Sequence, residues 1–252
     1  MVEMDDKYEF RHESERQHAL ESMRAYLAVK PEQVTFFEHV TEPYLGAQAG
    51  ARVLDACCGV GDLTYYLSRR FPDVQFVGID RAGFLVEEAR RQCADRAGVS
   101  FEEANLFRLS SHFAPKSFDY AVCKQTLSWL PDYQDAVREL MTVTRRAIFL
   151  SSLFYDGWID VNVRVREWQK AAASDGYTSY YNVYSVPALR EFCAGHGAKD
   201  VWAADFDIQI DLPRPPSPDR LGTYTRRLDT GARLQFSGPL FLPWKIVCIE
   251  LS

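Results

Sequence analysis

One short stretch constrains the fold of this chain more than any other. A strand-like segment at residues 52–55 ends in an acid and passes directly into a glycine-bearing turn, and a helical pattern begins at residue 62. Gly59 and Gly61 allow the backbone to approach a ligand closely and to take up positive φ. The N-terminus of the following helix offers free N–H groups to an anion. Asp55 closes the strand at its carboxyl end, which borders the ligand crevice in open α/β sheets. The stretch therefore predicts a ligand-binding strand–turn–helix unit.

Short apolar runs alternate with helical runs through the middle of the chain. Strands are predicted at 52–55, 74–79, 99–104, 118–123 and 147–150, and helices at 62–71, 85–96 and 133–144. This alternation is typical of right-handed βαβ crossovers and of a largely parallel sheet. We therefore expect an α/β fold with a doubly wound, mostly parallel sheet.

The regions on either side of this alternation have different patterns. Residues 1–50 show helical periodicity and predict an N-terminal helical lid. Residues 153–252 are rich in aromatic side chains, and 223–236 predicts a β-hairpin around a central turn. We expect a binding core at 51–152, with the aromatic insertion, the hairpin and the closing strands belonging to the same domain.

Two further strand ends carry residues that suit a nucleoside. Val77-Gly78-Ile79-Asp80 is a strand that ends in an acid, the position that holds ribose hydroxyls. Its separation from Gly59 is 80 − 59 = 21 residues, close to the ~20 of a nucleoside fingerprint. Asn105 follows the next strand and is placed to read an adenine edge. An NAD-type fingerprint fails because Thr64 stands where its third glycine belongs, and no Gly-Lys-Ser/Thr of a P-loop follows the turn.

With these motifs, residues 51–151 resemble a class I, seven-stranded, Rossmann-like S-adenosylmethionine-dependent methyltransferase. The first motif of that family reads Asp/Glu-x-Gly-x-Gly-x-Gly, and here Cys57 occupies the first glycine place. A cysteine is tolerated there if its φ is negative. The resemblance also implies that 199–210 and 244–251 are the reversed sixth and seventh strands of the sheet.

The same resemblance implies a set of residues around S-adenosylmethionine. The methionine part would lie at Asp55, Gly59 and Gly61, with Cys57 beside them; the ribose at Asp80; the adenine near Arg81, Asn105 and Leu106; and the sulfonium and acceptor near Lys124 and Gln125.

The composition narrows the classes of partner that this chain is expected to bind. The formal net charge is −6 and the arginines occur as scattered pairs, so we expect no nucleic-acid partner, because phosphate binding needs clustered positive charge. The polar N-terminus is unlike a signal peptide, no apolar run approaches the ~20 residues of a membrane span, and no Cys-x-x-Cys pair is present. We therefore expect a cytoplasmic protein without a membrane partner.

The residues after the fourth predicted strand narrow the classes of acceptor that this chain could methylate. They read Lys124-Gln125-Thr126-Leu127 instead of Asn/Asp-Pro-Pro-Tyr, which disfavours methylation of nucleic-acid bases. No Asp-Asn cluster follows, as it would in the magnesium-dependent catechol type, so we expect no metal.

The acceptor site is expected in the insertions. The segment 151–158 leaves the fifth strand above the cofactor, and Tyr155 and Asp156 are the candidates for orienting or deprotonating an acceptor. The alternative is that Tyr155 and Trp158 only pack an insertion. The aromatic residues of 177–184 would line the pocket or its outer wall. His12, His18 and Tyr26 are the lid residues that could face inward.

Three functions remain open at this stage. The first is O- or N-methylation of a small molecule, such as a metabolite, a natural product or a sugar. The second is methylation of a peptide or protein, for example on a carboxylate. The third is non-catalytic binding of S-adenosylmethionine. The sequence does not determine the oligomeric state.

Overall fold

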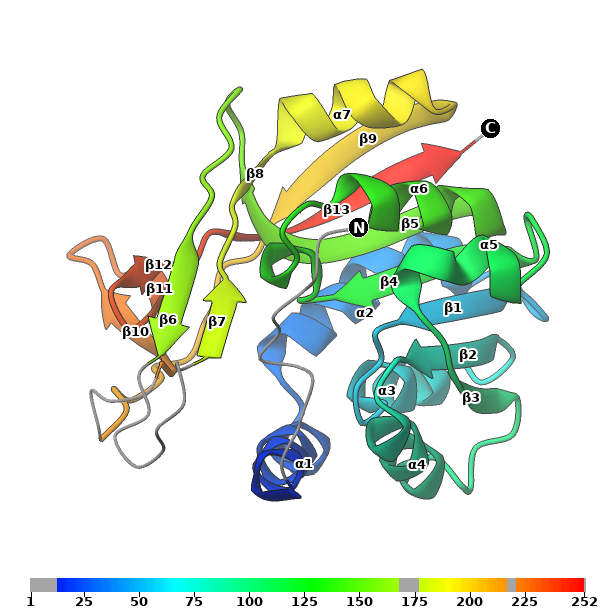
Figure 1. Cartoon of the computed structure of the whole chain (residues 1–252), viewed down its shortest axis with the longest axis horizontal. Coiled ribbons are helices and arrows are strands. Elements are labelled where there is room, and N and C mark those ends of the chain that lie inside the picture. Colours follow the sequence, from blue (N-terminus) through cyan, green and yellow to red (C-terminus); the bar gives the residue numbers. More distant parts are fainter. Residues whose placement is uncertain (1–12, 168–176, 217–220, 252) are drawn as a thin grey trace.

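A central sheet of seven hydrogen-bonded strands organises the computed structural model, which describes residues 13–167, 177–216 and 221–251 (Figure 1). Its strands are β1 (Arg52–Ala56), β2 (Gln75–Asp80), β3 (Val99–Glu103), β4 (Phe118–Lys124), β5 (Thr144–Tyr155), β9 (Ala198–Asp205) and β13 (Trp244–Leu251). The helices are α1 (Glu13–Ala28), α2 (Glu32–Leu45), α3 (Asp62–Arg70), α4 (Gly83–Gln92), α5 (Leu109–His112), α6 (Gln134–Val143) and α7 (Val186–Gly195), with short 3-10 turns η2 (Leu106–Arg108) and η3 (Leu127–Trp129).

The sheet is mostly parallel, as the sequence predicts. The strand order is β3-β2-β1-β4-β5-β13-β9, and β1 to β5 pair in parallel. β13 pairs antiparallel with both β5 and β9. The expectation of two reversed strands is therefore wrong for one of them: β9 runs in the same direction as β5, and only β13 is reversed. Because β13 is reversed, its first residue lies at the edge where the parallel strands end.

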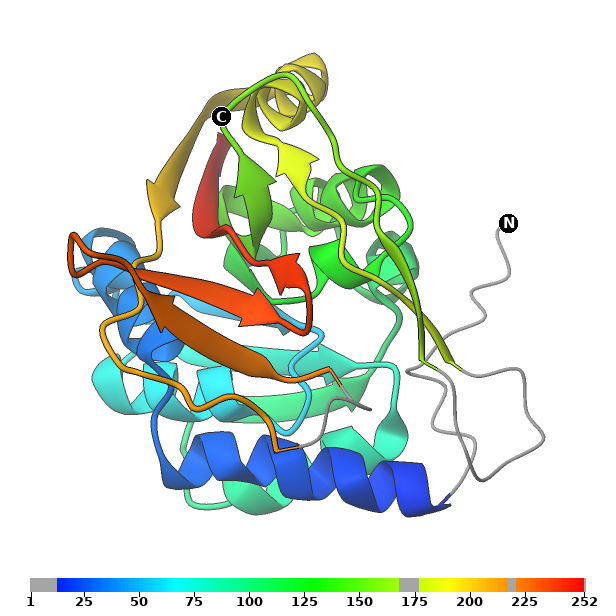
Figure 2. The ribbon, with the colours of Figure 1, turned by 90° about the vertical axis from the view of Figure 1, so that its left-hand side faces the viewer.

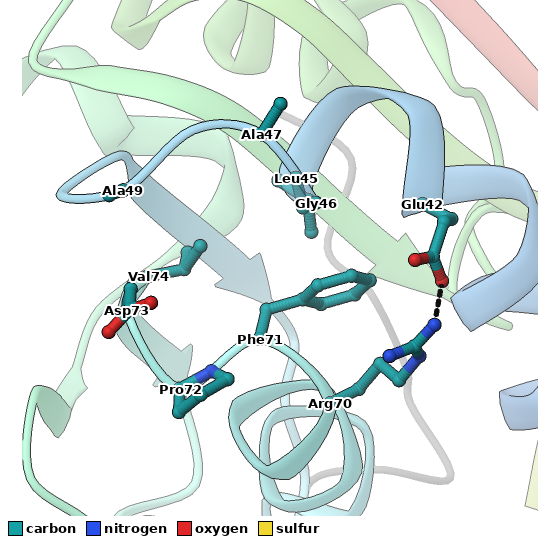
Figure 3. Close-up of a pocket in the computed structure, with 10 residues that line it drawn as sticks. All are labelled: Glu42, Leu45, Gly46, Ala47, Ala49, Arg70, Phe71, Pro72, Asp73 and Val74. Atoms are coloured by element: carbon teal, nitrogen blue, oxygen red, sulfur yellow. Dashed lines mark hydrogen bonds and ion pairs between the residues drawn. The ribbon is translucent and has the colours of Figure 1, made fainter.

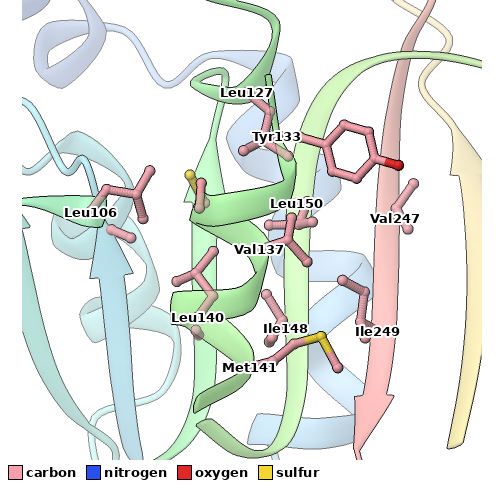
Figure 4. Packing of buried hydrophobic residues seen from close by; sticks show 14 of the residues in the cluster. Leu106, Leu127, Tyr133, Val137, Leu140, Met141, Ile148, Leu150, Val247 and Ile249 are labelled. Carbon is pink, nitrogen blue, oxygen red and sulfur yellow. The ribbon is translucent and has the colours of Figure 1, made fainter. Parts of the chain in front are cut away.

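Both faces of the sheet are covered, and the side chains of each strand alternate between them. Leu54, Ala121 and Ile148 point to the face covered by α6 and α7, while Val53 and Phe149 point to the face covered by α2 and α3. Figure 4 shows the first of these layers, with α6 side chains packed on β4, β5 and β13. Burial on both faces explains why these strands are continuous apolar runs.

Some element boundaries differ from the predicted ones. The helical region predicted before residue 50 is present as two helices, and Pro31 opens the second one as the N-cap of α2, with an extended backbone. The fifth strand extends over 144–155 instead of 147–150, because pairing with β13 continues to Leu153. The strand predicted at 199–210 ends at Asp205.

Two small β-structures lie beyond the edge where the parallel strands end (Figures 1 and 2). One is the ribbon of β6 (Arg164–Glu167) and β7 (Tyr177–Tyr180), and the other is the sheet of β10 (Thr223–Arg227), β11 (Arg233–Ser237) and β12 (Leu240–Phe241). β10 and β11 form the predicted hairpin. A short strand, β8 (Tyr184–Ser185), pairs with the end of β5. None of the helices in the described ranges is long and apolar enough to cross a membrane.

Candidate functional site

The loop between β1 and α3 has a strained backbone. Cys57, Gly59 and Gly61 all have positive φ, of 59°, 56° and 77°. The expectation of a negative φ at Cys57 is therefore wrong. A left-handed residue other than glycine costs about 1–2 kcal/mol, and such strain is concentrated at functional sites. The loop is tied to β2 by the Cys58 N–H, which donates to the Ile79 carbonyl at 2.8 Å.

The two glycines of this loop have different roles. A Cβ added at Gly61 would lie 2.9 Å from the Phe101 ring and 3.1 Å from the Ala89 methyl, so this glycine is required for packing against β3 and α4. A Cβ added at Gly59 would meet only the sulfur of Met23, at 3.5 Å. The backbone of Gly59 is therefore the part of the loop that a ligand can approach closely.

Asp80 lies beside Gly59 at the carboxyl end of β2. One carboxylate oxygen accepts from the Gly59 N–H and the other from the Ala82 N–H, both at 3.0 Å. Burial raises the pKa of Asp80 above its usual range, and these two backbone hydrogen bonds oppose that rise. Each oxygen of an ionised carboxylate has a second acceptor position. The carboxylate can therefore hold two ribose hydroxyls while it remains fixed to the loop.

Asp55 lies beneath the loop and is only 1% exposed. Its carboxylate accepts a hydrogen bond from the Thr64 hydroxyl of α3 at 2.6 Å. Burial raises the pKa of Asp55 to about 7. The sequence places Asp55 at the crevice, but the structure uses it to join the end of β1 to α3, so it supports the loop from behind.

A buried ion pair connects α3 to the end of β4. Lys124 Nζ donates to the carboxylate of Asp62 in the first turn of α3, and the two side chains are 12% and 8% exposed. The Tyr26 ring of α1 lies 5.6 Å from the same Nζ. The sequence motifs do not single out Asp62; an acid in the first helical turn, together with a lysine closing a neighbouring strand, is the signal that could have found it.

The residues predicted to lie near the adenine follow the ends of β2 and β3. Asn105 is exposed and caps η2, its side-chain oxygen accepting from the Phe107 N–H at 2.9 Å. Arg81 is exposed beside Asp80. The side chain of Leu106 is 4% exposed and belongs to the core under α6 (Figure 4). Leu106 therefore does not present its side chain to the crevice, whereas Asn105 and Arg81 are accessible.

The residue after β4 is also strained. Gln125 has a φ of 57°, and its N–H donates to the Ser151 carbonyl at 2.8 Å. Its side-chain amide donates to the side-chain oxygen of Gln33, in the first turn of α2. Gln33 is not among the residues that the sequence patterns point to.

Tyr155 and Asp156 lie away from the glycine loop. Tyr155 pairs with Ser185 at the start of α7, and its ring covers Gly157. The Asp156 carboxylate accepts from Lys245 Nζ at 3.0 Å, and the same Nζ also donates to Asp205 at the end of β9. Both candidates are thus on the β5–β13–β9 side of the sheet, and Asp156 is part of an ion-paired group.

Apolar and neutral polar side chains gather beyond the ends of β4 and β5. The apolar cluster consists of Leu153, Tyr181, Leu242 and Trp244, with Trp129 packed against it. The Trp129 and Tyr181 rings meet edge to face, 4.2 Å apart. The hydroxyls of Ser128 and Ser152 are hydrogen-bonded to each other beneath the cluster. These residues come from four separate segments, and none of them is charged.

A hollow lies at the opposite edge of the sheet. It has a volume of about 310 Å³ and is lined by the ends of α2 and α3 and the segments before β1 and β2, with an Arg70–Glu42 ion pair across it at 2.5 Å (Figure 3). A smaller hollow of about 180 Å³ lies between the end of β9 and β11–β12. The larger hollow faces none of the loops described above, because parallel strands present their ligand loops at their carboxyl ends.

Helix α1 lies next to the glycine loop. Arg24 donates two hydrogen bonds, at 2.7 and 2.9 Å, to the buried Glu88 of α4, and these bonds lower the Glu88 pKa to about 2. The Tyr66 hydroxyl donates to the carbonyl of Leu27 at 2.9 Å. Of the predicted inward-facing residues, Tyr26 reaches Lys124; His12 and the side chain of His18 lie outside the described residues.

The groups at this edge fit S-adenosylmethionine. The Asp80 carboxylate has acceptor positions for a ribose diol, and Gly59 leaves an open backbone surface for the chain that links ribose to the amino acid. The exposed Asn105 amide suits a base edge. We find that the residues present match the ligand that the sequence motifs imply.

Comparisons with known proteins agree with this reading. A family described as "Methyltransferase domain" matches residues 47–197. Demethylmenaquinone methyltransferase of Staphylococcus aureus (strain JH9) is 31% identical over 102 residues, which are 40% of this chain and 42% of that protein. The chain thus matches less than half of the length of this curated relative.

Solved structures with similar folds extend over more of the chain. The structure of magnesium protoporphyrin IX methyltransferase from Synechocystis PCC 6803 with bound SAH has a TM-score of 0.54 and 16% identity, covering 88% of this chain and 83% of that one. An O-methyltransferase family protein from Burkholderia thailandensis has a TM-score of 0.56 and 13% identity, covering 96% and 61%. At these identities the likeness supports the fold.

Proposed function

The chain belongs to the methyltransferase-domain family, and we propose that it is an S-adenosylmethionine-dependent methyltransferase whose acceptor is a small molecule methylated on oxygen or nitrogen. The observation that carries this proposal is the apolar cluster beyond the ends of β4 and β5, whose four core members are packed and at most 6% exposed. Its aromatic and aliphatic side chains, with the hydrogen-bonded hydroxyls of Ser128 and Ser152, come from separate segments. Groups of this kind suit a largely apolar small molecule, since ligand sites combine apolar walls with a few polar groups.

The bound cofactor supplies a methyl group that is already activated by a sulfonium. The protein therefore mainly aligns the nucleophile with that methyl group, and alignment alone can contribute about 7–11 kcal/mol. Asp80 and Gly59 would hold the nucleoside, while Asp55 and Thr64 keep the loop in place. A base is needed only for an acceptor that is still protonated at neutral pH.

The names of similar proteins agree with a small acceptor. Two of them are named for demethylmenaquinone and for magnesium protoporphyrin IX. Neither name defines the acceptor of this chain, but both concern small molecules with large apolar parts. A peptide acceptor is the second candidate, and non-catalytic binding of the cofactor is the third.

A labelling experiment separates these functions. The protein would be incubated with methyl-labelled S-adenosylmethionine and, separately, with a metabolite extract and a peptide pool. We expect label in the small-molecule fraction, and we expect it to resist mild alkali, because methyl ethers and methylamines survive conditions that cleave methyl esters. Label on peptides or alkali-labile label would contradict the proposal, and the absence of any transfer would favour the non-catalytic function. The Asp80→Ala variant serves as the control that lacks the cofactor site.

A further inference from the structure

Gln33 and Gln125 form a pair of side-chain amides at the edge of the sheet where ligands bind. They are 92 residues apart in the chain, and the Nε2 of Gln125 donates to the Oε1 of Gln33. Gln33 is 9% exposed and Gln125 is partly exposed. Gln125 directly follows the carboxyl end of β4, which in open α/β sheets borders the ligand crevice.

The backbone of Gln125 is strained in a way that points to function. In the described part of the chain, the residues other than glycine with positive φ are Cys57, Lys116 and Gln125. Two of these three directly follow the neighbouring strands β1 and β4. Each left-handed residue costs about 1–2 kcal/mol, and a structure retains such strain mainly where it positions something. At Gln125 the strain aims the side chain at Gln33.

The pair has hydrogen-bonding groups left over. A primary amide has one acceptor oxygen and two donor hydrogens. The bond between the two glutamines uses one N–H of Gln125 and the oxygen of Gln33, so the pair as a unit keeps the oxygen and the second N–H of Gln125 and the amino group of Gln33. In the described ranges neither side chain has another hydrogen bond, and neither is among the buried polar atoms that lack a partner. The Gln125 oxygen and the Gln33 amino group therefore each keep some solvent-accessible surface, although Gln33 as a whole is only 9% exposed.

Building on the small-molecule function proposed above, we propose that the Gln33–Gln125 pair binds the nucleophilic group of the acceptor, selecting a hydroxyl or an amine over a carboxylate. A hydroxyl or an amine both donates and accepts, so it matches one free amide oxygen and one free amino group. An ionised carboxylate only accepts, so it can bind the remaining N–H groups but leaves the oxygen of Gln125 without a donor and beside a negative charge.

The pair orients the nucleophile without removing its proton, because a neutral amide is not a base at physiological pH. As the acceptor's oxygen or nitrogen bonds to the methyl carbon, the bond from that carbon to sulfur breaks and its electron pair stays on sulfur. The proton of the acceptor passes to water. Gln33 and Gln125 are thus positioning groups at the nucleophile, and the preferred acceptors are amines and acidic hydroxyls.

A binding experiment tests the proposal without turnover. The side-chain NH₂ signals of the protein saturated with S-adenosylhomocysteine would be followed by NMR during titration with phenol, aniline or benzoate. We expect phenol and aniline to shift the signals of Gln33 and Gln125, benzoate to shift them much less, and the signal of the exposed Gln75 at the opposite edge to stay unchanged. No shift with any probe, or an equal or larger shift with benzoate, would overturn the proposal.

A variant of Gln33 tests whether this residue binds the acceptor or only supports the fold. In Gln33→Glu a carboxylate oxygen still accepts from Gln125, but the free amino group is lost. We expect phenol to bind about tenfold more weakly, as the loss of one hydrogen bond implies, with the affinity for S-adenosylhomocysteine within twofold of wild type. The matched control is Gln75→Glu, which adds the same charge at the far edge. Unchanged phenol affinity in Gln33→Glu would contradict the proposal, whereas failure of the small-molecule function would appear separately, as label on peptides.

Discussion

The two sides of the ligand edge are built in different ways. The cofactor side consists of a loop and strand ends close together in the sequence, and its central group, Asp80, is held by the backbone of Gly59 and Ala82. The proposed acceptor side gathers single side chains, such as Trp129, Leu153 and Trp244, from segments far apart in the chain. Backbone-held groups tolerate little variation, whereas a surface assembled from side chains can change with each segment. This difference explains why the sequence motifs identify the cofactor, whereas the acceptor can only be proposed.

The largest effect is expected on the cofactor side, at Asp80. In Asp80→Ala the ribose hydroxyls lose a charged acceptor, and each such hydrogen bond contributes about 1.5–3 kcal/mol. We expect the affinity for S-adenosylmethionine to fall a hundredfold or more by calorimetry. Asp73→Ala, at an exposed position on the opposite edge, is the control and should bind normally. An unchanged affinity in Asp80→Ala would show that Asp80 does not bind the ribose hydroxyls.

Asp55 should make stability depend on pH. Its pKa is raised from 3.8 to about 7, so between these values the folded protein keeps a proton that the unfolded chain has lost. Unfolding then releases a proton, and stability falls as pH rises from about 4 to about 7. The difference in unfolding free energy between wild type and Asp55→Asn should change by at most about 4 kcal/mol over this range, with wild type losing stability relative to the variant.

Urea denaturation at pH 4, 5.5 and 7.5 measures this difference. Comparison with Asp55→Asn cancels the contributions of other groups, including Glu88, whose lowered pKa acts at more acidic pH. A difference that is constant across the three pH values would show that Asp55 is ionised in the folded protein.

The two glycines of the loop should respond differently to alanine. In Gly61→Ala the new methyl group meets Phe101, so we expect a loss of about 2–4 kcal/mol in unfolding free energy from crowding and left-handed strain. In Gly59→Ala the space is nearly open, so we expect a loss of about 1–2 kcal/mol. Its affinity for S-adenosylhomocysteine should nevertheless fall about tenfold or more, because the methyl group occupies the surface a ligand approaches. Equal effects at the two positions, in urea denaturation and calorimetry, would refute this division.

The smallest effects are expected at Tyr155 and Asp156. Because Tyr155, the last residue of β5, pairs with Ser185 and Asp156 pairs with Lys245, we expect Tyr155→Phe and Asp156→Asn to keep turnover within about threefold of wild type. Steady-state rates with the acceptor found by labelling are the measurement. A loss of tenfold or more, with unchanged cofactor affinity, would restore the catalytic role that the sequence suggests.

The position of a residue along the chain decided how well its role could be predicted. Gly59 and Asp80 are 21 residues apart and belong to one βαβ unit, so their contact follows from spacing. Leu106 could not be placed from its neighbours, since only the packing of α6 decides which way it points. Cys57 is a third case, because the loop geometry imposes a positive φ that residues other than glycine disfavour.

By itself, the sequence determined the sheet, the order of the strand ends and the cofactor, because each rests on local periodicity or on short spacings. Only the tertiary structure decided which polar groups meet across long separations. Asp62 meets Lys124, 62 residues away, and Gln33 meets Gln125, 92 residues away. Such pairs depend on how whole helices pack against strand ends, and no local pattern encodes that packing. The proposed acceptor side rests on contacts of this kind, which is why it could be proposed only from the folded chain.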